Sequence, residues 1–155
     1  MTGIVATAFW KRLDTEGHDA CSLVGKADGW RLSGCAIFDH QGKSCQLAYS
    51  VDCDIEWRTL SAKVSGSVGF DELAFDVERK ATGDWLLNGT EQPAARGCID
   101  LDLGFTPATN LIAIRRLALR HGVETPAPAA YYLEFSLELG LLEQTYRRTG
   151  ETTLA

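Results

Sequence analysis

The sequence predicts a mainly β protein with a single α-helix. Apolar and polar residues alternate with a period of two through most of the chain, which is typical of half-buried strands. Turn-forming pairs such as Asp28-Gly29 and Asn88-Gly89 separate these segments, as expected for antiparallel hairpins. Only one segment, close to 107–120, has helical spacing. These features predict about eleven to thirteen short strands in a sandwich, barrel or roll.

The first half of the chain is predicted to consist of consecutive strands. Val5, Phe9 and Leu13 share one face of the first alternating segment. Trp10 and Arg12 lie on its opposite face. The same alternation predicts further strands at 20–25, 30–38, 44–51, 56–64 and 73–79.

Alternation returns in the second half. The segment 98–103 places Cys98, Asp100 and Asp102 on one face. The segments 133–139 and 142–148 predict two more strands. Because no repeat, low-complexity tract or long linker divides the chain, residues 1–155 are expected to form a single domain.

The helix is predicted from its start signal and its spacing. Thr106-Pro107 is typical of an N-cap followed by proline at the first helical position. Apolar residues from Leu111 to Leu117 then recur at helical spacing, which predicts a helix over about 107–120. The competing interpretation is a short helical turn followed by a strand over 112–119.

Composition excludes several classes of function. The net charge of −6 argues against non-specific nucleic-acid binding, which needs Lys and Arg to neutralise phosphates. No stretch approaches the roughly 20 apolar residues of a membrane-spanning helix, so we expect no membrane insertion. The five cysteines lack a CxxC pair and the three histidines are scattered, so we expect reduced thiols, a cytoplasmic location, no cofactor and no metal.

One stretch resembles a known family signature. Residues 97–117 read GCIDLDLGFTPATNLIAIRRL, with a Cys-x-Asp-φ-Asp strand, a Thr-Pro-x-Thr-Asn turn and a hydrophobic-Arg-Arg-Leu segment. This stretch resembles the putative glycolipid-binding family of bacterial proteins. The rest of the pattern is carried by Trp10, Gly34, Tyr49, Trp57-Arg58 and Gly83-Asp84-Trp85. The chain departs from the family pattern at Ala108, where an aromatic is common, and at Ala113, where a proline is common.

The resemblance implies a fold and a function. The implied fold is a spiral β-roll, a single antiparallel sheet of about eleven to fifteen strands wrapped around one helix. The implied function is non-enzymatic binding of a glycolipid or another amphiphilic small molecule, held between the sheet and the helix. The fold analogy alone does not identify a site.

Candidate ligand-binding residues come from the signature and its surroundings: Asp100, Asp102, Thr106, Thr109, Asn110, Arg115, Arg116 and Trp85. Asp100 and Asp102 lie about 7 Å apart along a strand, a spacing open to acid/base chemistry or cation binding. The favoured interpretation of the pair is a structural network with Arg115 and Arg116, because a buried arginine needs a carboxylate.

The other candidates also have structural interpretations. Thr106, Thr109 and Asn110 form either an anion site at a helix start or ordinary caps. Trp85 is expected to be partly exposed beside the Asn88-Gly89 hairpin. Cys98 is expected to be an inert buried thiol, since no basic partner is adjacent in the sequence.

Two other functions stay open. The first is an enzyme acting on a phosphorylated or acylated small molecule, with Asp100 and Asp102 as acid/base groups or metal ligands. The second is a structural module that forms a homodimer through an exposed sheet edge or face. We therefore expect either a monomer or a homodimer. No P-loop, dinucleotide fingerprint, HExxH motif or nucleophile elbow occurs in the sequence.

Overall fold

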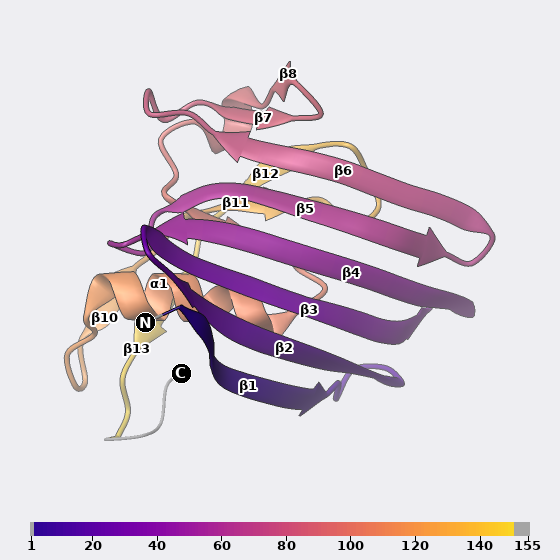
Figure 1. The fold of residues 1–155 in the computed structure, drawn as a ribbon, viewed down its shortest axis with the longest axis horizontal. Coiled ribbons are helices and arrows are strands. Elements are labelled where there is room, and N and C mark those ends of the chain that lie inside the picture. The colour runs from indigo at the N-terminus through magenta and orange to yellow at the C-terminus, as the bar shows by residue number, and fades with distance from the viewer. Residues whose placement is uncertain (1, 151–155) are drawn as a thin grey trace.

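The computed structural model describes residues 2–150 and is dominated by one large antiparallel sheet. Figure 1 shows its eight strands side by side in the order in which they follow in the sequence. They are β1 (Gly3–Lys11), β2 (Gly17–Lys26), β3 (Gly29–His40), β4 (Lys43–Asp54), β5 (Thr59–Val68), β6 (Asp71–Arg79), β7 (Trp85–Leu87) and β8 (Thr90–Glu91). The sheet is open, with β1 and β8 at its edges.

The other described elements lie on one side of this sheet (Figure 1). Strand β11 (Ala129–Tyr132) pairs in parallel with β9 (Asp100–Asp102) and antiparallel with β12 (Leu139–Leu142). A second small sheet joins β10 (Glu124–Pro126) to β13 (Thr145–Arg147). The helical elements are the 3-10 helices η1 (Pro93–Ala95) and η2 (Pro107–Thr109) and the α-helix α1 (Asn110–Leu117).

The mainly β class, the large antiparallel sheet and the single α-helix are confirmed. The strands nevertheless fall into three sheets, and one pair of them is parallel. The helix is shorter than 107–120, because its first turn is the 3-10 helix η2 and Ala118 adopts a left-handed conformation with φ 46° and ψ 54°.

The predicted strand over 133–139 is wrong. Phe135 has a positive φ of 54°, and Leu133 accepts a hydrogen bond from the Ser136 N–H, so the segment is a turn. Phe135 instead stacks on Phe38, with ring centroids 6.5 Å apart. The strand lies just before, at β11, where the alanines have no alternating pattern because both faces are buried.

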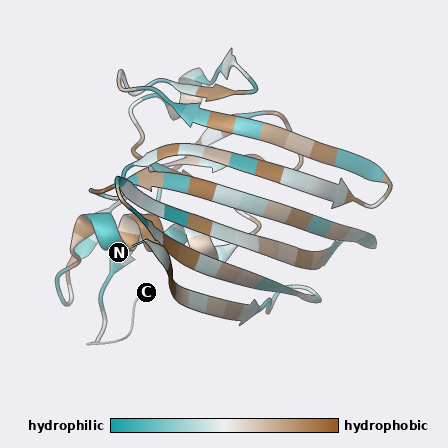
Figure 2. Ribbon diagram, viewed as in Figure 1, coloured by the Kyte–Doolittle hydropathy of each residue, from teal (hydrophilic) through white to brown (hydrophobic). Residues whose placement is uncertain are grey.

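The core lies between the large sheet and the elements on its inner side. Figure 2 shows the alternation of apolar and polar residues along the long strands. Their inward residues, such as Leu47 and Val51, are fully buried, as is Ile112 of α1. The space between sheet and helix is therefore filled with side chains.

Candidate functional site

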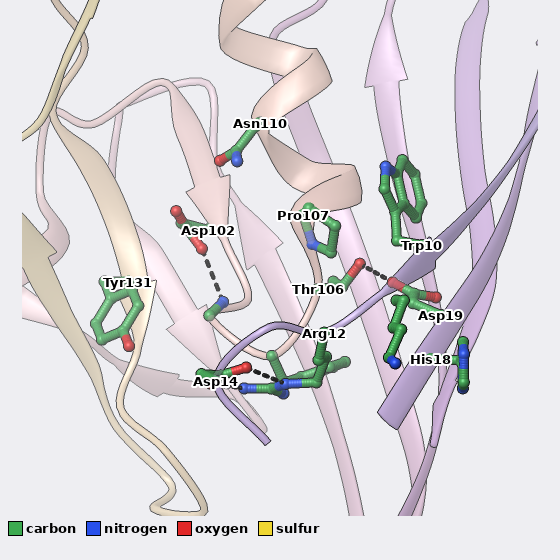
Figure 3. Close-up of a pocket in the computed structure, with 13 residues that line it drawn as sticks. Trp10, Arg12, Asp14, His18, Asp19, Asp102, Thr106, Pro107, Asn110 and Tyr131 are labelled. Atoms are coloured by element: carbon green, nitrogen blue, oxygen red, sulfur yellow. Dashed lines mark hydrogen bonds and ion pairs between the residues drawn. The ribbon is translucent and has the colours of Figure 1, made fainter. Parts of the chain in front are cut away.

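A pocket of about 470 Å³ lies beside η2, between the end of β1, the start of β2 and the segment 102–110 (Figure 3). Its apolar surfaces come from Trp10 and Phe105, together with Tyr131 of β11. Trp10 and Tyr131 are each half-buried, so part of each aromatic ring stays accessible.

Thr106 and Pro107 determine where the 3-10 helix η2 begins. Thr106 precedes Pro107 and is extended, with φ −135° and ψ 138°, because a residue before proline avoids the helical region. The Thr106 hydroxyl accepts a hydrogen bond from the Ala108 N–H at 3.1 Å, which caps the 3-10 helix. This turn forms one wall of the pocket.

Asp19 is the most deeply buried acid in the pocket wall. It lies on the inward face of β2, opposite Trp10 of β1, and is only 3% exposed. Its carboxylate accepts hydrogen bonds from the Tyr49 hydroxyl, at 3.0 Å to each oxygen, and from the Thr106 hydroxyl. Tyr49 reaches Asp19 across Gly34, where any side chain would collide with the tyrosine ring.

Asp102 lines the opposite side of the pocket (Figure 3). Its Oδ1 accepts a hydrogen bond from the Gly104 N–H at 2.7 Å. Burial raises the pKa of both Asp19 and Asp102. Within residues 2–150, no lysine, arginine or histidine nitrogen lies within 4.0 Å of either carboxylate.

Basic residues lie at the rim. Arg12 pairs with Asp14 at 2.7 Å and stacks over Phe38, with 4.5 Å between the guanidinium carbon and the ring centroid. Lys11 and His18 are exposed and face each other in the pairing of β1 with β2. The pocket is thus acidic and aromatic inside and basic at its rim.

Asn110 contributes a directed polar group. Its Oδ1 accepts a hydrogen bond from the Tyr146 hydroxyl at 2.9 Å, which orients the amide. Asn110 also lines the pocket, and the Nδ2 of its amide carries two N–H donors.

Comparison with known proteins identifies the family to which the chain belongs. The model of the family described as putative glycolipid-binding matches residues 7–154. The chain belongs to this family. The crystal structure of a DUF1089 family protein from Pseudomonas aeruginosa is similar, with a TM-score of 0.75, 24% identity, and coverage of 94% of this chain and 78% of that chain. The search of curated proteins found no match to the present chain.

Three predicted site residues of this family member line the pocket: Asp102, Thr106 and Asn110. Asp100 and Arg116 do not. Arg116 donates to both oxygens of Asp100 at 2.9 and 2.6 Å, and Asp100 is 1% exposed. This is the structural network that the sequence favoured, with Arg116 as its cation.

The other three candidates lie away from the pocket. Thr109 is buried and accepts a hydrogen bond from the Leu103 N–H at 3.4 Å. Arg115 lies over the Trp57 ring, 5.9 Å from its centroid. The expectation that Trp85 is partly exposed is wrong. It is 1% exposed, because its indole N–H donates to the Cys98 carbonyl at 3.1 Å and the ring packs inward from β7.

Sequence reasoning missed Trp10, Asp19 and Tyr131 as pocket residues. The sequence pattern could have indicated Asp19, because it alternates in step with Cys21 and Leu23 and therefore lies on the inward face of β2. A charged residue in the buried phase of a strand indicates a special environment. No comparable local signal distinguishes Tyr131, because the long-range parallel pairing of β11 with β9 places it opposite Asp102.

Three further observations concern the Cys98 thiol, metal binding and the helices of the described residues. Burial raises the pKa of the Cys98 thiol, which is the opposite of what a nucleophile needs. Residues 2–150 contain no cluster of His, Cys, Asp and Glu suited to a metal ion. None of the helices in these residues has the length and apolar character to cross a membrane.

Proposed function

We propose that this protein binds an amphiphilic ligand whose sugar-bearing headgroup occupies the pocket beside η2. The observation that carries the proposal is the pairing of two accessible aromatic surfaces, Trp10 and Tyr131, with the polar groups of Asp102 and Asn110 in one pocket. Sugar rings present apolar C–H faces that pack on aromatic rings, and their hydroxyls bond to carboxylates and amides. A concave site with a few directed polar groups is the usual form of a small-molecule site.

An adjoining groove suits the apolar part of such a ligand. The groove has a volume of about 450 Å³ and shares His18 with the headgroup pocket. Phe9 and Ile37 line it and are 72% and 54% exposed. Exposed apolar side chains beside a polar pocket favour an alkyl chain lying across β1 and β2. In this proposal the ligand binds at the edge of the sheet, since the space behind the sheet is filled.

A binding role is favoured over catalysis. Both oxygens of the buried Asp100 carboxylate accept hydrogen bonds from Arg116, and this ion pair disfavours acid/base work or metal binding by Asp100. The five cysteines are free thiols, which fits the cytoplasmic location that forms part of this proposal.

Titration with octyl glucoside below its micellar concentration, followed by NMR of the labelled protein, tests the function. We expect saturable shifts at the Trp10 indole and at Gly104. Trp10→Ala should weaken binding of both octyl glucoside and glucose, whereas Phe9→Ser should weaken only octyl glucoside. Phe70→Ser is the matched control, because Phe70 lies at a fully exposed turn and its loss should leave binding unchanged. A tryptophan control at Trp85 is unsuitable, because that side chain is in the core. Shifts that neither Trp10→Ala nor Phe9→Ser alters would refute this site.

A further inference from the structure

The two pocket carboxylates differ from every other shielded acid in the described chain. Six acidic residues in residues 2–150 are buried or half-buried. Four of them have a cationic partner: Asp52 with Arg31, Asp54 with Arg58, Asp84 with Arg96 and Asp100 with Arg116. The other two are Asp19 and Asp102, and both line the same pocket.

We propose that the headgroup pocket recognises a ligand with a protonated amine, such as an amino sugar, whose ammonium group supplies the positive charge that Asp19 and Asp102 lack among residues 2–150. This inference rests on the proposed binding function and deepens it by naming the chemical class of the headgroup. An N-acetylated or neutral sugar of the same shape would lack the charge.

The environment of Asp19 explains why hydrogen bonds alone do not replace a cation. Tyr49 and Thr106 donate to the carboxylate and bring no charge. A buried carboxylate without a counter-charge favours its neutral form, which agrees with the direction in which burial moves its pKa. An ammonium group offers three N–H donors together with the missing charge.

The aromatic side chains of the pocket also favour a cationic ligand. Trp10 lies directly opposite Asp19 across the β1–β2 pair, and Tyr131 lies on the Asp102 side (Figure 3). Ring faces attract ammonium groups, and tryptophan does so most strongly. A cation in this pocket would therefore meet acidic groups and aromatic faces together.

The basic residues around the pocket do not cancel this preference. The charge of Arg12 is matched by Asp14 at 2.7 Å. Lys11 and His18 line the rim of the pocket, but within residues 2–150 no side-chain nitrogen of either lies within 4.0 Å of the Asp19 or Asp102 carboxylate. His18 stacks on Phe9, with ring centroids 5.2 Å apart. The neutral titratable groups near the two carboxylates include the Cys21 thiol and the phenols of Tyr49, Tyr131 and Tyr146, whose pKa values burial raises.

The test compares three probes with one alkyl chain: octyl glucoside, octyl 2-amino-2-deoxyglucoside and its N-acetyl derivative. Calorimetry near pH 7 should show the amine binding at least about tenfold tighter than the N-acetyl probe, a difference of about 1.4 kcal/mol. Asp19→Asn should reduce this preference to about twofold or less. Asp28→Asn makes the same change of net charge at the exposed β2–β3 turn and should keep the full preference.

Each outcome decides between the two proposals. Equal binding of amine and N-acetyl probes overturns the amine inference and leaves the binding function in place. Failure of all three probes to bind overturns the binding function itself. Should Asp19→Asn not fold, Asp102→Asn replaces it, and an undiminished amine preference in the folded variant overturns the inference.

Discussion

The Thr106 hydroxyl donates a hydrogen bond to the buried carboxylate of Asp19, although the two residues lie 87 positions apart in the chain. The same oxygen accepts from the Ala108 N–H and caps η2. One side chain thus starts the helical segment and attaches it to β2. The pocket wall depends on this attachment, because Asp19, Thr106 and Pro107 all line it.

Replacing Thr106 by valine should destabilise the protein by about 1–3 kcal/mol. Valine keeps the shape and removes both the cap and the bond to Asp19, so a buried acid loses a donor. Urea denaturation measures the change. Thr7→Val, at an exposed position of β1, is the control and should stay within about 0.5 kcal/mol of the wild type. Equal effects of the two substitutions would contradict the role of Thr106.

Breaking the Asp100–Arg116 pair should cost more than breaking a surface pair. Arg116→Met leaves a carboxylate that is 1% exposed without its cation, so we expect a loss of about 3–5 kcal/mol. Arg58→Met removes an exposed arginine from Asp54 and should cost much less, because water screens that pair. Denaturant midpoints of the two variants give the comparison, and a larger loss for Arg58→Met would reverse it.

Gly34→Ala should destabilise the protein by about 1–3 kcal/mol, because the new methyl group would strike the Tyr49 ring and the Ala20 carbonyl. The neighbouring Ser33→Ala, on the outer face of β3, should be nearly neutral. Thermal unfolding of the two variants checks the difference. A neutral Gly34→Ala variant with an unchanged tyrosine environment by NMR would show that the close approach is not required.

Asp19 should make a pH-dependent contribution to stability. Burial raises its folded-state pKa above 3.8, so the native state binds the proton more tightly than the unfolded state. This contribution is fully present below the unfolded-state pKa and is lost as the pH rises through the folded-state pKa. The free energy of unfolding of Asp19→Asn, relative to the wild type, should therefore increase with pH above about 4. Urea titrations at several pH values measure it, and a constant difference would contradict the shift.

The local pattern was most informative where burial alternates along a strand. The long strands β2 to β6 were predicted because each exposes one face and buries the other. The same rule failed at 133–139. That segment alternates in sequence, yet Phe135 turns back onto Phe38, and the strand is β11, in which only Tyr131 is half-buried and the other residues are buried. Apolar–polar alternation detects strands with one solvent-exposed face and overlooks strands that are buried on both faces.

The sequence by itself determined the mainly β class, the start of the helical segment at Thr106-Pro107 and the resemblance to the family. Each of these depends on residues close together in the chain. Only the tertiary structure decided which acid meets a cation. Asp100 pairs with Arg116, whereas Asp102, two positions away, has no such partner in the described part of the chain. The reason is physical, because the charge balance of a carboxylate depends on long-range neighbours, and the strand pattern specifies only the face on which it lies.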